Sequence, residues 1–338
     1  MKKTILVIFA FALIWACKKK EPMKNSTAPN SKGSIEVIDE KLNEVLDTNA
    51  SIEVIAEGYD WSEGPLWLPE QQKLIFSDVP RNTIYSWSEA EGDTVYLKPS
   101  GFTGENFRGS EPGSNGLTLN NQGELVLCQH GNRQVSVMKA PLDRPEPNYE
   151  ALASAFDEKR FNSPNDLVFD RAGNLYFTDP PYGLPGGMED SEKDLDFQGV
   201  YRVSPDGEVS LLTDELSRPN GLAFSPDEKT LYVANSDPDK AIWMAYALDG
   251  DGKVTEKKLF YDVTDWVQKE KGLPDGMKVD KAGNVFATGP GGVWVFSPEG
   301  KHLGTIKTGE ATANCAFNDD KSVLYMTADS YILRLKIK

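Results

Sequence analysis

The sequence has few of the side chains from which zinc sites and disulfide frameworks are built. It contains only three cysteines and two histidines in 338 residues. Zinc prefers Cys and His ligands, and neither His130 nor His302 has a partner at ligand spacing. Cys128 and Cys315 lie about 190 positions apart on predicted strands, unlike the dense disulfide pattern of a small secreted domain. We therefore expect both of these cysteines to be buried and unpaired.

No hydrophobic run is long enough to cross a bilayer. The apolar stretch Thr4–Ala16 has thirteen residues, whereas a spanning helix needs about 20. Two lysines precede it and Cys17 follows it, which is typical of an export signal. The tetrapeptide IWAC resembles a bacterial lipoprotein box, although an ordinary signal peptide with an incidental cysteine is the alternative. Residues 1–16 are thus predicted to be a lipoprotein-type signal peptide, with Cys17 lipidated and the protein anchored in the bacterial cell envelope, facing the periplasm.

Acidic residues outnumber basic residues in the sequence. The chain has 36 Lys and Arg against 52 Asp and Glu, a formal net charge of −16. Such a charge argues against nucleic acid or an anionic membrane surface as a partner, leaving the lipid at Cys17 as the predicted membrane contact. It is compatible with cation binding, although a solvated acidic surface explains most of it. Residues 17–49 are polar and too poor in apolar side chains to fold alone, so we predict a tether with at most one short helix around Val37–Leu46.

Long helical periodicity is also missing, and a repeat of short strands takes its place. Each copy opens on a polar residue, continues with a strand of about four residues and a polar turn, and returns in a second strand that ends on a polar residue. The copies are spaced 52, 50, 55, 55 and 39 residues apart, and they open at Glu63, Asn115, Asn165, Asn220, Asp275 and Asn314. Most copies add a third and a fourth strand. This pattern predicts an all-β, six-bladed β-propeller over residues 50–338.

The ends of the repeat predict how the propeller closes. The last copy finishes after three strands, and the strand predicted at Ser51–Ala56 has no blade of its own. We expect this N-terminal strand to complete the last blade, which leaves no open sheet edge.

The opening residues are expected to meet at one mouth of the central channel, because the first strand of each propeller blade is innermost. All six carry a side-chain oxygen, and two of them are carboxylates. Calcium accepts about six to eight oxygen ligands in flexible geometry, whereas magnesium demands a stricter octahedron. The ring therefore predicts a calcium site. The alternative is that Asn and Asp before Gly only shape the entry of each strand.

A second ring is expected where the returning strands end, at Asp78, His130, Asp179, Asn235, Gly289 and Asp329. His130 is a candidate for proton transfer there, or else a hydrogen-bonded histidine at a strand end. Asp179 belongs to the segment FTDPPYGL, from which Tyr182 could reach the same mouth; a proline-rich turn is the alternative. The G-x-S-x-G, H-E-x-x-H and P-loop patterns are absent from the sequence.

Four segments carry a family resemblance. EGPLW, SPNDLVFDRAGNLYFTDPPYGL, RPNGLAFSPDEKTLYVANSDP and LPDGMKVDKAGNVF resemble the gluconolactonase/senescence marker protein (regucalcin) family, and bacterial gluconolactonases in particular. The resemblance implies a calcium-dependent, six-bladed propeller that hydrolyses sugar lactones. It places the metal ligands on Glu63, Asn220 and Asp275, and gives Asn165 to the metal or the substrate. Animal members of the family hold the sugar acid with an arginine at the position that is Ser163 here.

The expected function is that of a calcium-dependent hydrolase that opens sugar lactones through a metal-polarised carbonyl and attack by water. Mg²⁺, Mn²⁺ or Zn²⁺ could replace calcium. Asp275 or His130 is expected to take the proton of the water, and the predicted substrate-binding residues are Asn115, Asp179, Tyr182 and Asn314. One alternative is a lactonase, esterase or phosphotriesterase that acts on a non-sugar substrate. Another is a non-catalytic envelope propeller that binds a ligand; the two carboxylates in the ring favour an enzyme.

Overall fold

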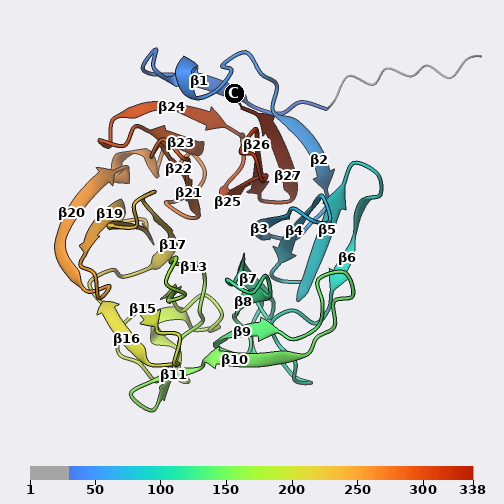
Figure 1. The fold of residues 1–338 in the computed structure, drawn as a ribbon, viewed down its shortest axis with the longest axis vertical. Helices are drawn as coiled ribbons and strands as arrows, with labels where there is room; N and C mark the ends of the chain where they lie inside the picture. The colour runs from blue at the N-terminus through green and yellow to red at the C-terminus, as the bar shows by residue number, and fades with distance from the viewer. Residues whose placement is uncertain (1–29, 338) are drawn as a thin grey trace, which may run out of the picture.

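Six antiparallel sheets surround a central channel in the computed structural model of the protein (Figure 1). The structure describes residues 30–337. The fold predicted from the repeat, an all-β six-bladed propeller, is confirmed. The predicted signal peptide and Cys17 lie outside the described residues and stay predictions. Within residues 30–337, no helix has the length and apolar character needed to span a bilayer.

The blades follow the chain in order, and each runs from its inner strand outward. Blade 1 consists of β3 (Ser62–Leu68), β4 (Lys73–Asp78), β5 (Thr83–Ser88) and β6 (Gly92–Leu97). Blade 2 consists of β7 (Ser114–Leu119), β8 (Leu125–Gln129), β9 (Gln134–Met138) and β10 (Tyr149–Ala153). Blade 3 consists of β13 (Leu167–Phe169), β14 (Leu175–Asp179), β15 (Gly199–Val203) and β16 (Val209–Thr213).

The second half repeats this arrangement. Blade 4 consists of β17 (Pro219–Phe224), β18 (Thr230–Asp237), β19 (Lys240–Leu248) and β20 (Val254–Asp262). Blade 5 consists of β21 (Met277–Val279), β22 (Val285–Gly289), β23 (Gly292–Phe296), β24 (His302–Lys307) and β1 (Ser34–Val37). Blade 6 consists of β25 (Thr312–Phe317), β26 (Val323–Ala328), β27 (Tyr331–Lys336) and β2 (Glu53–Glu57). The remaining elements are α1 (Leu42–Val45), the hairpin β11 (Ala155–Phe156) and β12 (Lys159–Arg160), and the 3-10 turns η1 (Gly187–Glu189) and η2 (Thr264–Trp266).

The hydrophobic core lies between neighbouring blades. Between blades 2 and 3, Cys128 of β8 packs in one cluster with Phe177 of β14 and Tyr201 of β15, and the two rings are 5.2 Å apart. Cys315 is buried in the corresponding cluster around blades 5 and 6. Both cysteines are free, as the sequence predicted. Because each blade buries one face on each neighbour, the six inner strands are held at fixed positions around the axis.

The N-terminal strand closes the ring as predicted. β2 pairs antiparallel with β27, and Glu53 lies opposite Arg334. The Arg334 guanidinium donates to the Glu53 carboxylate over 2.7 Å, which joins the first and last parts of the propeller. Blade 6 is therefore complete only with residues from both ends of the described chain.

The tether predicted for residues 17–49 needs correction over its described part. β1 pairs antiparallel with β24 on the outer edge of blade 5 (Figure 1), so that Ile35 lies opposite Ile306. The helix expected within Val37–Leu46 is α1. Leu42 is 1% exposed and Leu46 is fully buried in the core around blades 5 and 6. A polar segment with only a few apolar residues folds here because the edge of β24 supplies unpaired backbone groups and the blade supplies the apolar surface.

We expect Leu46→Ala to lower the free energy of unfolding by about 2–4 kcal/mol, since it leaves a cavity in a closed core. Ile38→Ala is the matched control in the same segment, because the Ile38 side chain is 56% exposed; it should change stability by less than about 0.5 kcal/mol. Denaturant unfolding of the two variants measures both values. Equal effects of the two substitutions would show that the segment does not brace the propeller.

Candidate active site

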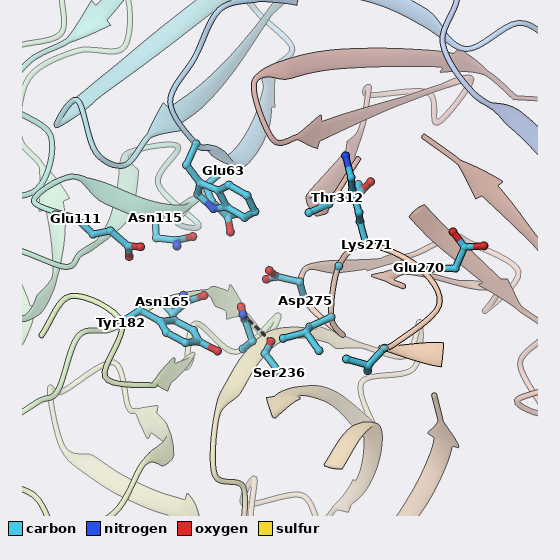
Figure 2. A pocket seen from close by; sticks show the side chains of 16 residues that line it. Glu63, Glu111, Asn115, Asn165, Tyr182, Ser236, Glu270, Lys271, Asp275 and Thr312 are labelled. Carbon is cyan, nitrogen blue, oxygen red and sulfur yellow. Dashed lines mark hydrogen bonds between the residues drawn. The ribbon is translucent and has the colours of Figure 1, made fainter. Parts of the chain in front are cut away.

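A cavity of about 480 Å³ opens at the mouth of the channel where the inner strands begin. Five of the six opening residues line it: Glu63, Asn115, Asn165, Asn220 and Asp275. Tyr182 lines it as well, from the loop after β14. Figure 2 shows the labelled residues of this set, Glu63, Asn115, Asn165, Tyr182 and Asp275, converging on one space from several blades. The structure thus brings together most of the residues that the repeat had aligned.

The glycines after the opening residues let the inner strands approach closely. A Cβ on Gly221, which follows Asn220, would lie 2.2 Å from the backbone oxygen of Asp275. A Cβ on Gly276, which follows Asp275, would lie 2.0 Å from the side chain of Asn314. Only glycine fits at such approaches. The Asn-Gly and Asp-Gly pairs therefore set the spacing of the ring as well as its chemistry.

Several side-chain oxygens in this ring are buried without a hydrogen-bond partner among the described residues. They are the Oδ1 atoms of Asn115, Asn220 and Asp275. The Asn220 amide nitrogen donates to Ser236 Oγ over 2.9 Å, which fixes the amide and leaves its oxygen free. Unpaired buried oxygens are costly unless something else satisfies them.

The negative charges in the ring repel one another. Burial raises the pKa of Glu63 to about 8, with further contributions from the charges of Asp166 and Glu111, against the opposing hydrogen bond from the Gly64 amide. Burial, followed by the charge of Glu63, raises the pKa of Asp275 well above its usual range. A bound cation would favour the charged form of both carboxylates.

The ligand chemistry of the ring fits a hard divalent cation. No group of three or more His, Cys, Asp or Glu side chains that could hold a metal occurs among residues 30–337. The available donors are instead two carboxylates and several amide oxygens, a set that suits calcium or magnesium better than zinc. Glu63, Asn165, Asn220 and Asp275 are the residues that could hold such an ion.

Asn314 does not line the cavity, contrary to its predicted place in the substrate site. Its amide nitrogen donates to Asp166 Oδ2 over 3.3 Å, and its oxygen accepts from Lys278 Nζ over 3.3 Å. Thr312 lines the cavity in its place. In blade 6 the inner strand β25 begins at Thr312, two residues before Asn314.

Asp179, which the sequence predicted to bind the substrate, is not among the residues that line the cavity. Its two carboxylate oxygens accept the backbone amides of Asn162 and Ser163, each over 2.8 Å. Burial raises the pKa of Asp179 to about 7 in spite of these two donors. Asp78 accepts the equivalent amides of Asp60 and Trp61. Asp78 and Asp179 therefore hold the loops that precede Glu63 and Asn165.

His130 lies behind the cavity wall. The imidazole is fully buried, and its Nδ1 is 3.4 Å from Oε2 of Glu111, which does line the cavity. The histidine predicted for proton transfer thus does not line the cavity, whereas its neighbour Glu111, which the repeat did not single out, does.

Residues 61–330 match the family described as "SMP-30/Gluconolactonase/LRE-like region". The chain belongs to this family. It is 41% identical to a gluconolactonase of Zymomonas mobilis, over 93% of this chain and 89% of that protein. The family resemblance carried by the four motifs is therefore confirmed.

Solved structures agree with this membership. A gluconolactonase of Xanthomonas campestris superposes with a TM-score of 0.79 and 31% identity, covering 93% of this chain and 99% of that one. A protein described as a calcium-binding regucalcin, from Agrobacterium tumefaciens, superposes with a TM-score of 0.64. It is 19% identical and covers 84% of this chain and 94% of that one, a level that supports the shared fold alone.

This family member departs from the arginine that the resemblance implies for animal relatives. Ser163 is fully buried, and its hydroxyl donates to the Pro180 carbonyl over 2.6 Å. It does not line the cavity. On the rim, Lys271 pairs with Glu310 over 2.7 Å. A substrate in this member is thus not held by an arginine at the family's position.

Sequence reasoning missed several polar residues, among them Glu111 and Ser236 of the cavity wall and the buried Asp166. Glycine follows the opening residues Asn115, Asn220 and Asp275, whereas Asp166 follows Asn165. This departure from the pattern is the signal that could have identified Asp166. Glu111 lies in the loop SEPGSNG, four residues before an opening residue. Ser236 directly follows a returning strand's predicted end, but serine is too common at such positions to be noticed.

Proposed function

We propose that this protein hydrolyses sugar lactones, of the gluconolactone type, with the help of a divalent cation held at the channel mouth. The chain is a gluconolactonase-like lactone hydrolase, in keeping with its family and with its identity to a gluconolactonase over most of its length. The observation that carries the cation requirement is the buried ring of carboxylate and amide oxygens without partners.

Four residues are proposed to hold the ion, preferably calcium: Glu63, Asn165, Asn220 and Asp275. When bound, the cation would supply Lewis-acid polarisation of the lactone carbonyl. The chain contributes a rigid set of ligands. The Asn220 amide is fixed by Ser236, whose hydroxyl in turn donates to the Pro274 carbonyl beside Asp275.

The remaining cavity residues are proposed to orient the lactone ring. Asn115 supplies an amide, and Tyr182 supplies a phenol that remains a hydrogen-bond donor at neutral pH. Burial, followed by the charge of Asp275, raises the pKa of this phenol. The volume of about 480 Å³ is within the range of small-ligand pockets. Leu273 and Val267 add apolar surface to the wall, which limits the access of water.

A panel of lactones tests this proposal. We expect turnover of aldonolactones, its loss when EDTA removes the cation, and its return when calcium is added. Aromatic lactones and phosphotriesters, assayed in parallel, test the alternative of a non-sugar substrate. If no ester in the panel is hydrolysed in a chelator-sensitive way, the proposed function is wrong and the ligand-binding alternative gains support.

A further inference from the structure

One carboxylate in the cavity wall has no assigned task. Four carboxylates line the cavity: Glu63, Glu111, Glu270 and Asp275. Two of them belong to the proposed cation site. Glu270 accepts from Lys307 Nζ over 3.0 Å. Among the described residues, Glu111 has no lysine or arginine partner, and its Oε2 atom lies 3.4 Å from Nδ1 of His130.

The contact between Glu111 and His130 is built into the fold. The backbone amide of His130 donates to the Gly113 carbonyl over 3.1 Å, two residues beyond Glu111. The amide of Gly113 donates to the Val79 carbonyl over 2.9 Å. A Cβ on Gly131 would lie 2.6 Å from the Pro112 carbonyl oxygen, so the loop packs directly on the strand end that carries the histidine.

The other side of the loop is anchored as well. Arg108 pairs with Asp190, and its Nε is 3.2 Å from Glu192. These pairs tie the loop that carries Glu111 to the segment that carries Tyr182. Glu111 is therefore held between two supports, while its side chain keeps 34% exposure at the cavity. In Figure 2 its carboxylate points into the space shared by Asn165 and Asp275.

Hydrogen bonds of the imidazole do not explain why His130 is buried beside Glu111. Its side chain is fully buried, and neither ring nitrogen has a hydrogen-bond partner among the described residues. A buried imidazole without partners is unfavourable. The Oε2 atom of Glu111 lies 3.4 Å from the imidazole Nδ1. The Glu111 carboxylate lines the cavity and lies within the field of Glu63 and Asp275.

We propose that Glu111 is the general base and general acid of lactone hydrolysis, with His130 as the residue that positions it. The inference rests on the proposed function. Glu63 and Asp275 have their oxygens committed to the cation, whereas Glu111 is free to exchange a proton.

The proton balance of this step is complete. As the water oxygen bonds to the carbonyl carbon, one water proton passes to the Glu111 carboxylate. When the bond between the carbonyl carbon and the ring oxygen breaks, Glu111 returns this proton to the ring oxygen. The product is the open hydroxy acid, and Glu111 is again a carboxylate.

Glu111→Gln tests the assignment. We expect kcat to fall by about 10²–10⁴, the usual contribution of general acid–base catalysis, while KM and the calcium-induced rise in Tm change little. Glu111→Asp should restore part of kcat, because it retains the carboxylate. Glu105→Gln is the matched control: it lies in the same loop, is exposed, and should behave as wild type.

The histidine supplies a readout that does not depend on turnover. With only two histidines in the chain, ring resonances can be assigned by NMR, and His302 serves as the internal reference, stacked on Trp294 at 4.2 Å. Glu111→Gln should shift the His130 ring signals and leave those of His302 in place. His130→Gln should retain the calcium-induced rise in Tm, lower kcat more than it changes KM, and alter the pH profile of kcat.

Three results would overturn the inference. These are a kcat for Glu111→Gln within about threefold of wild type, a loss of calcium binding in that variant, which would make Glu111 a ligand, or unshifted His130 signals. Absence of lactone turnover in the wild type is a different outcome, since it refutes the proposed function itself.

Discussion

Asp275→Asn should reduce kcat/KM for lactones by about a thousandfold or more and largely abolish calcium binding. The carboxylate is a proposed ligand, and Lewis-acid assistance is worth several kcal/mol, with each 1.36 kcal/mol equal to a factor of ten in rate. The substitution preserves shape. It also removes a buried charge that repels Glu63, so the cation-free variant should melt no lower than the cation-free wild type at pH 8. Steady-state kinetics and calorimetry measure the two effects.

The control for this substitution is Asp265→Asn, an exposed carboxylate in the turn η2 that precedes the same blade. It should leave kinetics and melting unchanged. An Asp275→Asn variant that keeps both its activity and its calcium-induced rise in Tm would remove Asp275 from the site.

Calcium affinity should increase by about tenfold or more per pH unit as the pH rises from 6 toward 8, because Glu63 and Asp275 both have a raised pKa. The folded protein raises the pKa of Glu63 to about 8, from an ordinary value of 4.5. In the cation-free protein this group therefore contributes stability that is fully present below about pH 4.5 and lost as the pH rises through 8. Calcium needs the charged carboxylate, so binding below pH 8 releases a proton, and the apparent affinity rises as fewer protons compete.

Isothermal titration in buffers of different ionisation enthalpy measures both the affinity and the protons released. The rise in Tm caused by calcium should be small at pH 6 and large at pH 8. Glu63→Gln serves as the comparison: it removes a proposed ligand together with its titrating proton, so the calcium-induced rise in Tm should be small at both pH 6 and pH 8. An affinity that stays constant between pH 6 and 8 in the wild type would show that binding does not compete with these protons.

Two differences between the sequence-based expectations and the structure have a common physical cause. The spacing of the repeat placed Asp179 and Asn314 at the correct mouth of the channel but said nothing of where their side chains point. Asp179 turns back to the amides of Asn162 and Ser163, because a buried carboxylate binds the nearest unpaired donors. Asn314 fits into the space left by Gly276. Such choices depend on contacts between segments that are distant in the chain.

The sequence by itself determined the propeller, its closure by an N-terminal strand, and the oxygen-rich ring at the channel mouth. It could do so because alternating apolar residues specify strands, and a sixfold repeat specifies how the strands stack. Only the tertiary structure decided that β1 and α1 brace blade 5, and that Glu111 joins His130 to the cavity. Glu111 lies outside the repeat, nineteen positions from His130, and the packing of Pro112 on Gly131 is what brings the two side chains together.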